Sequence, residues 1–293
     1  MPSGLKHIVR SVTRKIFWGG FHKILSDRQY AKIRYWFDVG RPLDLRKPSA
    51  LTEKIQYLKL NSRNPSRKIA ANRLKVRDYV GEKVGEEYLI PLLLQTDELN
   101  ISDWESLPGR FVLKGNHGCG MVKLIFDKSS VEFEEIKKLT QSWLNFDYAK
   151  FGREWVYKDV PRKIVVEELL TSSEDEIPED YKFFCFHGRV EMIQVDMGRF
   201  KNQRRNLYNR DFQLFDVKCL YPNSEKKITK PQNLDEMIDV AERLASEFDF
   251  IRVDLYSVNG KIYFGELTNF PGNGFIAYQP DSFDFELGKK LKL

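Results

Sequence analysis

Two acidic residues in the last third of the chain, Asp254 and Glu266, could bind a divalent cation together. They lie in the apolar runs "IRVDLY" and "IYFGEL", which are joined by Asn259-Gly260, a strong hairpin signal. Counting outward from this turn makes the two carboxylates near neighbours across a ladder, where they repel each other unless a cation lies between them. Asp and Glu oxygens with few other ligands, beside a phosphate site, suit Mg²⁺.

The alternative interpretation of this hairpin is that both carboxylates face solvent, which strand alternation permits. Glu266 leads, however, into "TNFPGNG", a Pro/Gly turn that presents Thr268 and Asn269 at the same end of the hairpin. This arrangement favours the metal site over the solvent-facing alternative.

A second group of residues could bind phosphate. The stretch "FVLKGNHGCGMVKLIF", residues 111–126, contains two β-type runs around a loop that holds Gly115, Gly118 and Gly120 and is entered through Lys114. The loop matches neither GxxxxGK[ST] nor a GxGxxG between strand and helix. A glycine-rich loop between antiparallel strands can still fold over a triphosphate, with amides donating to phosphate oxygens while the lysine neutralises charge. Many such turns bind nothing, so the acidic hairpin is needed to support this interpretation.

The elements that must position these residues mix helices with antiparallel strands. Hydrophobic periodicity and capping signals predict helices over residues 49–61, 67–85, 131–146 and 234–248. Strands are predicted over residues 88–94, buried and with Pro91 at a bulge or edge, and over 162–170. Hairpins are predicted over residues 111–126, 181–196 and 250–274. The expected class is therefore α+β with antiparallel sheets, not a doubly wound parallel sheet.

Composition limits the class of protein. The 293 residues exceed a typical single core, and 42% hydrophobic with 13% aromatic residues exclude a disordered chain. The three cysteines are widely spaced without a CxxC, which argues against a disulfide framework or a zinc site and fits a reducing cytoplasm. Without an apolar run of transmembrane length or a signal peptide, we expect a soluble cytoplasmic protein.

The N-terminal segment is basic and amphipathic. Up to Ser26 it has five basic residues and no acidic one, while apolar residues recur at helical spacing and end in "FWGGF". Residues 5–25 therefore suit an anionic membrane surface, which would make the protein peripheral on the inner face of the cytoplasmic membrane. The equal alternative is a helix that packs on the body and shows a solvated basic face. Nucleic acid is not an expected partner, because no reading motif or aromatic-basic sheet pattern occurs.

The order of these parts resembles the TupA-like group of the ATP-grasp superfamily, which is linked to bacterial surface-polysaccharide (teichuronopeptide) biosynthesis. The resemblance extends from about Pro48 to the C-terminus and rests on the motifs "LTEKIQYLKLNSRNP", "KVRDYVGEKVGEEYLIPLL", "FVLKGNHGCG", "DYKFFCFHGRVEMIQVD", "RRNLYNRD" and "IRVDLYSVNGKIYFGELT". It implies ATP held between two α+β lobes. The implied parts are an N-terminal helical segment, an N-terminal subdomain, a central lobe and a C-terminal lobe, over residues 1–47, 48–108, 109–170 and 171–293.

The resemblance also assigns cofactor residues for ATP and Mg²⁺. It implies Lys114 as the central phosphate lysine, and Gly115 to Gly120 as the loop over the phosphates. Arg73 stands where a phosphate-binding lysine usually follows Asp; here the pair is Asn72-Arg73. The implied hinge that faces adenine comprises Glu167, Glu168, Leu169 and Leu170. Asp254 and Glu266 match the metal carboxylates, but Thr268 stands where the family has an Asn ligand, with Asn269 one residue later.

The implied reaction is ATP-dependent ligation of a carboxylate to an amine through an acyl phosphate. The resemblance suggests an amino acid or amine joined to the carboxyl of a uronic acid in a capsular or cell-wall glycan or its precursor. The residues predicted to bind the substrates and the acyl phosphate are Lys182, Arg199, Arg204 and Arg205.

Three alternatives remain open at this point. A sugar or polyol kinase would use the same nucleotide site without needing an amine. A glycosyltransferase usually carries a DxD, and the sequence has none. A non-catalytic scaffold at the membrane would have no use for the set formed by Lys114, Asp254 and Glu266.

Overall fold

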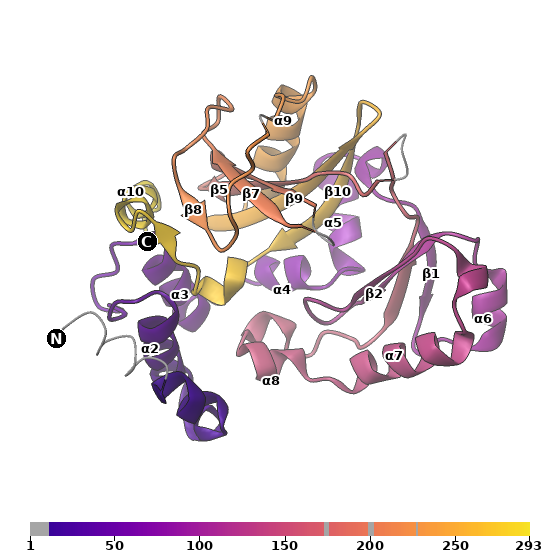
Figure 1. Ribbon diagram of the computed structural model, residues 1–293, viewed down its shortest axis with the longest axis horizontal. Helices are drawn as coiled ribbons and strands as arrows, with labels where there is room; N and C mark the ends of the chain where they lie inside the picture. Colours follow the sequence, from indigo (N-terminus) through magenta and orange to yellow (C-terminus); the bar gives the residue numbers. More distant parts are fainter. Residues whose placement is uncertain (1–11, 173–175, 199–201, 227) are drawn as a thin grey trace. The chain divides into compact units, whose positions relative to one another are not determined.

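The computed structural model describes residues 12–172, 176–198, 202–226 and 228–293 (Figure 1). The chain forms two compact units, which are described separately. Unit 1 comprises residues 1–62, 216–223 and 270–293, and unit 2 comprises residues 63–215 and 224–269. The candidate site lies within unit 2.

Unit 2 contains a four-stranded antiparallel sheet in the order β1-β4-β2-β3. Its strands are β1 (Leu92–Thr96), β2 (Phe111–Gly115), β3 (Val122–Ile125) and β4 (Ile164–Glu167). Phe111 and Leu113 of β2 are buried in one core cluster with Trp104 of helix α6 (Ile101–Ser106) and Ile136 of helix α7 (Phe133–Asn145). Side chains alternate along a strand, so Val112 and Lys114 point to the opposite face of the sheet.

The second sheet of unit 2 has five antiparallel strands in the order β10-β9-β5-β6-β7. Its strands are β5 (Asp180–Phe186), β6 (Arg189–Met197), β7 (Arg204–Tyr208), β9 (Phe250–Val258) and β10 (Lys261–Thr268). Helix α9 (Leu234–Ala245) covers one face, where its apolar side joins Phe183, Ile193 and Val253 in the largest core cluster (Figure 1). The other face is polar near the strand ends and carries the candidate site.

The predicted helix over residues 67–85 is two helices, α4 (Ser66–Ala71) and α5 (Lys75–Lys83). The break is at Asn72, whose backbone is extended and whose side-chain Oδ1 accepts hydrogen bonds from the amides of Leu74 and Lys75, both at 3.1 Å. Asparagine competes with the helix for these amides, and the apolar periodicity of the segment does not reveal that competition. The consequence is functional, since the break places Arg73 in the candidate site.

The predicted buried strand over residues 88–94 is also wrong in detail. Glu86–Tyr88 form a 3₁₀ turn (η2), Pro91 precedes the strand, and β1 runs from Leu92 to Thr96 as the edge of its sheet. Leu92 and Leu93 are exposed. The expectation that Pro91 marks a bulge or an edge agrees with the position of β1 at the edge of its sheet. The expected burial is wrong, because an edge strand leaves one side of its ladder and part of its side chains exposed.

The remaining elements of unit 2 are short. They are η3 (Lys128–Ser130), α8 (Tyr148–Gly152) and η4 (Trp155–Tyr157). The predicted helices over 131–146 and 234–248 and the three predicted hairpins are all present in this unit. The expected α+β class with antiparallel sheets is confirmed.

Unit 1 is mainly helical. Residues 12–18 form a helix, followed by η1 (Phe21–Ile24), α2 (Asp27–Asp38), α3 (Leu51–Asn61), β8 (Lys218–Cys219), η5 (Pro271–Gly274), β11 (Tyr278–Gln279) and α10 (Ser282–Lys290). Its core gathers aromatic side chains, Phe17, Tyr30, Tyr35, Phe37 and Phe275. Among the described residues, the helices are too short or too polar to cross a bilayer.

Candidate active site

The acidic pair predicted from the sequence is brought together in the five-stranded sheet. Glu266 of β10 lies directly opposite Asp254 of β9 in the ladder, and Asp254 lies opposite Lys182 of β5. Simple counting from the hairpin turn would place Gly265 opposite Asp254. A register shift between Phe264 and Glu266 moves Glu266 into that position, which is what a β-bulge does to the residue that follows it. The bulge therefore aligns two carboxylates and a lysine on neighbouring strands.

The absence of a side chain at Gly265 lets the two strands pack closely at this bulge. A Cβ built at this position would lie 3.1 Å from the carbonyl oxygen of Asp254 and 3.0 Å from the ring of Tyr256. A Cβ here would therefore require the Asp254 carbonyl or the Tyr256 ring to shift by a few tenths of an ångström. A lone glycine inside a strand pattern is a known signal for a bulge, and it was available in the sequence.

Arg252 lies between the two carboxylates. Its Nε donates to Asp254 Oδ1 at 2.6 Å and its Nη2 donates to Asp254 Oδ2 at 2.6 Å. The same Nη2 is 3.1 Å from Glu266 Oε1 and 2.8 Å from Thr268 Oγ1. Arg252 was not among the predicted site residues, although it lies two residues before Asp254 on a predicted strand and so shares its face. A cation does lie between the carboxylates, as the hairpin argument required, and it is a guanidinium.

The charges continue along the sheet on both sides of Arg252. Lys182 Nζ forms ion pairs with Asp180 on its own strand and, at 2.8 Å, with Asp254 Oδ2. At the other end Arg73 Nη1 is 3.4 Å from Glu266 Oε2. Acidic and basic side chains therefore alternate in one continuous series of ion pairs, in the order Asp180, Lys182, Asp254, Arg252, Glu266 and Arg73.

Burial and these neighbours set the protonation of the carboxylates. Burial alone would raise the pKa of Glu266, but the guanidiniums of Arg73 and Arg252 outweigh it and hold the pKa well below its ordinary value. Burial raises the pKa of Asp254 above the ordinary aspartate value. Burial also disfavours charge on Arg252, yet the Asp254 carboxylate outweighs that effect and raises its pKa. Glu266 is thus ionised at neutral pH and able to bind a cation.

The two other predicted metal residues behave differently. Thr268 is in place, because its Oγ1 is 2.8 Å from Glu266 Oε1. Asn269 is buried and directed elsewhere: its Nδ2 donates to the carbonyl of Arg67 at 2.9 Å and its Oδ1 accepts from Arg67 Nη1 at 3.3 Å. The structure does not bring Asn269 to the carboxylates, since successive side chains of an extended chain point to opposite sides.

The glycine-rich loop is held by Arg73. Its Nε donates to the carbonyl of Gly115 at 2.9 Å and its Nη2 to the carbonyl of Gly118 at 3.0 Å. Asn116 adds a bond from its Nδ2 to the carbonyl of Pro161 at 2.8 Å. Arg73 therefore connects the loop to Glu266. A lysine carries its three N–H donors on one nitrogen and could not reach the three acceptors that Arg73 contacts with three separate nitrogens.

Two of the three loop glycines lie so close to other side chains of the protein that a Cβ would clash. A Cβ on Gly118 would lie 2.8 Å from the ring of Tyr148, and one on Gly115 would lie 2.7 Å from the sulfur of Met121. Gly120 is different: its φ of +79° is the left-handed region, and a Cβ there would meet nothing within 4 Å. A side chain is therefore excluded at Gly118 by Tyr148 and at Gly115 by Met121.

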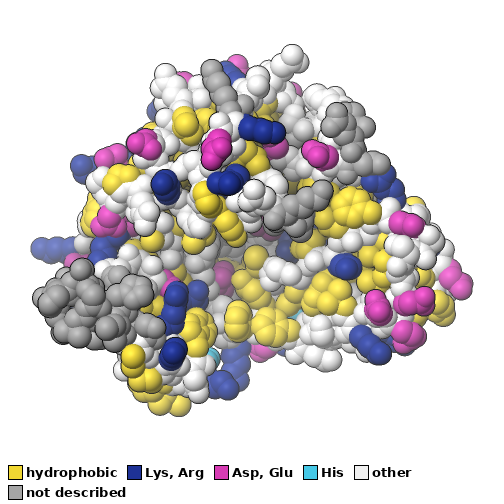
Figure 2. Space-filling view, in the orientation of Figure 1, with side chains coloured by type: hydrophobic (Ala, Val, Ile, Leu, Met, Phe, Trp, Pro, Cys, Tyr) yellow, Lys and Arg dark blue, Asp and Glu magenta, His cyan; other side chains and the backbone are white. Residues whose placement is uncertain are grey.

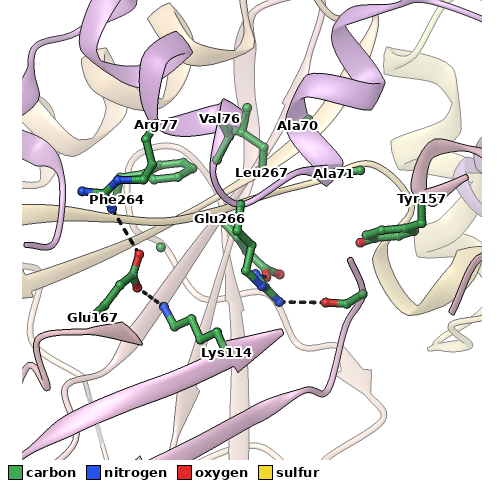
Figure 3. A pocket seen from close by; sticks show the side chains of 13 residues that line it. Ala70, Ala71, Val76, Arg77, Lys114, Tyr157, Glu167, Phe264, Glu266 and Leu267 are labelled. Atoms are coloured by element: carbon green, nitrogen blue, oxygen red, sulfur yellow. Dashed lines mark hydrogen bonds and ion pairs between the residues drawn. The ribbon is translucent and has the colours of Figure 1, made fainter. Parts of the chain in front are cut away.

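Lys114 is fixed by an acidic partner on the neighbouring strand. Figure 3 shows Glu167 between Lys114 and Arg77, and it forms an ion pair with each, the Arg77 Nη1 to Glu167 Oε1 distance being 3.2 Å. Arg77 Nη2 also donates to the carbonyl of Ile90 at 2.9 Å. These three side chains line a pocket together with Tyr157, which directs its hydroxyl toward Glu266 (Figure 3). Burial raises the pKa of the Tyr157 hydroxyl, so this group remains a hydrogen-bond donor.

A second pocket, which shares Arg73, Lys114 and Glu266 with the pocket in Figure 3, has apolar walls and a charged end. The walls come from Ile90, Val112, Val122, Leu124, Ile177 and Tyr256, and the charged end from Arg73, Lys114, Asp180, Asp254 and Glu266. Glu168, Leu169 and Leu170 also line it, and the amide of Glu168 donates to the carbonyl of Pro91 at 3.1 Å. Three of the four predicted hinge residues, the predicted phosphate lysine and the predicted metal carboxylates thus line one cavity, whereas Glu167 lines the pocket in Figure 3. Apolar walls with a few convergent charges are what a nucleotide requires.

The predicted acceptor residues are only partly brought together. Lys182 lies in the series of ion pairs described above. Arg205 is buried and pairs with Asp196, its Nε 2.6 Å from Oδ1 and its Nη2 2.9 Å from Oδ2. Arg204 is the neighbouring residue of β7, opposite Met197, and so points to the other face of the sheet, away from Arg205. Arg199 lies outside the described residues.

The residues present fit ATP with Mg²⁺. Mg²⁺ is usually held by one or two carboxylates together with substrate phosphates and water, and Asp254 with Glu266 supplies such a pair, to which Thr268 adds a hydroxyl. Lys114 and Arg73 supply the cations that triphosphate oxygens need. Within the described residues, no cluster of three or more His, Cys, Asp or Glu side chains offers a metal site by itself. Binding of the metal is therefore expected to depend on the nucleotide.

Several solved structures are similar to the chain. D-Alanine–D-alanine ligase from Bacillus anthracis complexed with ATP shares 16% identity at a TM-score of 0.41, covering 70% of this chain and 55% of that one. The corresponding ligase from Helicobacter pylori shares 13% at 0.42, covering 83% and 70%. The ATP-grasp ligase PsnB complexed with minimal precursor, Mg and ADP shares 12% at 0.44, covering 82% and 66%. The chain thus spans little more than half of the Bacillus anthracis ligase.

None of the curated proteins compared with the chain matches it significantly. The family model described as TupA-like ATPgrasp matches residues 53–292, which include every described site residue discussed above. The chain therefore belongs to the TupA-like ATPgrasp family and has the α+β ATP-grasp fold.

Proposed function

We propose that this protein is an ATP-dependent carboxylate–amine ligase. The observation that carries the proposal is the cavity in which Lys114, Arg73, Asp254 and Glu266 converge beside apolar walls. Family membership supports the same reading. Because the reaction consumes ATP, the proposed location of the activity is the cytoplasm, where ATP is available.

Each group has a task in binding ATP. The apolar walls and the segment from Glu168 to Leu170 would enclose adenine, and Lys114 and Arg73 would bind the phosphates. Asp254 and Glu266 would hold Mg²⁺, which when bound neutralises phosphate charge. The Arg73 contacts to Gly115 and Gly118 fix the loop, so little ordering remains to be done when the nucleotide binds.

The proposed reaction has two steps. A carboxylate oxygen of the first substrate attacks the γ-phosphorus of ATP, and the bond from the γ-phosphorus to the β,γ-bridging oxygen breaks. The products of this step are ADP and an acyl phosphate of the first substrate. The nitrogen of an amine then attacks the acyl carbon, inorganic phosphate departs, and the amine loses a proton. Both steps gather negative charge on phosphoryl oxygens, which Lys182 and Arg252 are placed to neutralise.

The proposed substrates are the carboxyl of a uronic acid in a surface polysaccharide or its precursor, and an amino acid or other amine. The family supports this choice, and the cationic side chains along the sheet suit an anionic sugar acid. In this proposal Arg205 positions the Asp196 side chain and does not contact the substrate itself. Its Nε and Nη2 both donate to the Asp196 carboxylate.

The test is release of ADP by the purified protein with Mg²⁺-ATP and glucuronate or galacturonate, with and without a pool of amino acids. A ligase releases ADP only when both are present, and Glu266→Gln lowers the rate by about a hundredfold or more. The matched control is Glu135→Gln on the exposed side of α7, which leaves the rate unchanged. ADP release with sugar alone and a stable phosphorylated sugar would show a kinase instead.

A further inference from the structure

A surface of unit 1 exposes large apolar side chains. Val12, Ile16, Trp18, Phe21 and Ile24 have 51%, 61%, 41%, 44% and 79% of their surface exposed. Ile16 and Phe21 line a hollow together with Ile33 and Trp36 of α2. Val12 is one helical turn before Ile16, and Ile24 is one 3₁₀ turn after Phe21, so both extend the same apolar surface. Val12, Ile16, Phe21, Ile24, Ile33 and Trp36 are called the N-terminal apolar surface below.

The segment that carries this surface is packed firmly on unit 1. Phe17 is 1% exposed, and its ring centroid lies 5.1 Å from that of Tyr30 and 5.0 Å from that of Phe37. Arg14 forms an ion pair with Asp38 at the end of α2. His22 Nδ1 is 2.8 Å from the carbonyl oxygen of Phe17. The helix over residues 12–18 thus packs on the rest of unit 1 through Phe17. Its exposed face carries apolar side chains as well as basic ones.

Lysines surround these apolar side chains. Lys15, Lys23 and Lys32 are exposed, and Lys32 lines the hollow itself. None of the three takes part in the ion pairs seen among the described residues. Residues 12–36 contain six basic residues and one acidic residue, Asp27. Figure 2 shows hydrophobic and basic side chains side by side over the indigo helices of Figure 1.

We propose that the N-terminal apolar surface docks on an anionic lipid bilayer. Exposed Trp, Phe and Ile side chains interleaved with lysines are the composition of an element that lies in the membrane interface. Apolar groups then enter the acyl boundary while the lysines meet anionic headgroups. The residues belong to unit 1, so docking requires none of the nucleotide-binding side chains of unit 2.

A second copy of the chain fits this surface less well. The cores of protein–protein interfaces are depleted in lysine, whereas lysines here line and surround the hollow. A two-fold symmetric contact would also place the same basic residues of both copies against one another, which costs binding energy. Charge complementarity therefore selects the bilayer.

The test is sedimentation of the full-length protein with vesicles. We expect binding to vesicles of phosphatidylglycerol and phosphatidylcholine in equal parts, binding at least about tenfold weaker to phosphatidylcholine alone, and further weakening with added salt. Replacing Lys15, Lys23 and Lys32 together with Gln should weaken binding to anionic vesicles on the order of a hundredfold.

The apolar contribution has a matched control within the chain. Phe21→Ser with Ile24→Ser should weaken vesicle binding by about tenfold or more, because these side chains no longer enter the lipid. Ile101→Ser, at a residue of α6 that is 52% exposed, should leave binding unchanged. Because all three positions are exposed, the variants should keep the unfolding temperature of the original protein, which checks that they fold.

Three outcomes would overturn the proposal. The first is failure of the original protein to bind anionic vesicles. The second is an equal loss in the Ile101→Ser variant. The third is a dimer in sedimentation velocity that Phe21→Ser dissociates while vesicle binding persists, which would assign the surface to a second copy.

Discussion

The guanidinium of Arg252 is bonded through two nitrogens to the carboxylate of Asp254, with both distances 2.6 Å. The two residues are on one strand, two positions apart, and Arg252 also contacts Glu266 across the ladder. The same carboxylates are the proposed ligands of Mg²⁺. Arg252 and the metal therefore compete for one pair of acidic groups, and binding of the metal has to free the guanidinium.

Replacing Arg252 with Leu is predicted to strengthen metal binding without nucleotide. The two carboxylates lose a competing cation, so affinity for Mn²⁺, measured by titration calorimetry, should rise by at least about tenfold. The metal-free protein should lose about 3 kcal/mol of unfolding free energy, because buried carboxylate charge loses its partner. Arg252→Lys keeps the charge and serves as the control. Unchanged or weaker Mn²⁺ binding in Arg252→Leu would contradict the competition.

Asn269 is predicted to support the fold and not the metal. Asn269→Ala leaves the buried carbonyl of Arg67 without its side-chain donor, which should lower the unfolding free energy by roughly 1–3 kcal/mol in urea denaturation. Mn²⁺ affinity should stay within about twofold in this variant, whereas Glu266→Gln should lower it by tenfold or more. If Asn269→Ala lost metal affinity and kept its stability, the position assigned to its side chain would be wrong.

The two kinds of glycine in the loop are predicted to respond differently to Tyr148. Gly118→Ala should destabilise the protein by about 1–3 kcal/mol, because its Cβ meets the Tyr148 ring. Gly120→Ala should cost about 1 kcal/mol from its backbone conformation alone. In a Tyr148→Ala background the first cost should largely disappear and the second should persist, which a double-mutant cycle measures. Equal coupling of both glycines to Tyr148 would contradict this account.

Arg73 is predicted to order the glycine-rich loop. Arg73→Lys keeps the charge but cannot donate to Gly115, Gly118 and Glu266 at once, so amide hydrogen exchange of residues 115–120 should quicken by about tenfold. ATP affinity should fall together with this loss of order. Lys68→Arg on the exposed side of α4 is the control and should change neither quantity. A loop that exchanges at the original rate in Arg73→Lys would show that Arg73 does not hold it.

Much of the fold could be read from the sequence because hairpin signals are local. The hairpins predicted over residues 181–196 and around Asn259-Gly260 are both present in the structure. The same local reasoning failed at Asn72, where a side chain competes with the helix, and over residues 88–94, where a strand predicted to be buried leaves Leu92 and Leu93 exposed. Both errors concern competition or burial that neighbouring residues do not reveal.

The site was harder to predict than the fold. Asp254 and Glu266 were found as carboxylates, but their alignment depends on the bulge at Gly265, which changes the register by one residue. Arg252 was missed because a charged residue beside a strand carboxylate has many possible partners. Arg204 and Arg205 were grouped by adjacency in sequence, yet adjacent residues of a strand point to opposite faces. Adjacency along the chain was thus a poor guide to adjacency in the site.

The central claim is that a carboxylate attacks ATP and passes through an acyl phosphate. The most direct measurement uses glucuronate or galacturonate labelled with ¹⁸O in the carboxyl group, with Mg²⁺-ATP and an amino-acid pool. A ligase transfers one carboxyl oxygen to the released inorganic phosphate, which ³¹P nuclear magnetic resonance detects as a shifted signal. The account predicts labelled phosphate in proportion to amide formed. Unlabelled phosphate, or phosphate retained on a sugar hydroxyl, would contradict it.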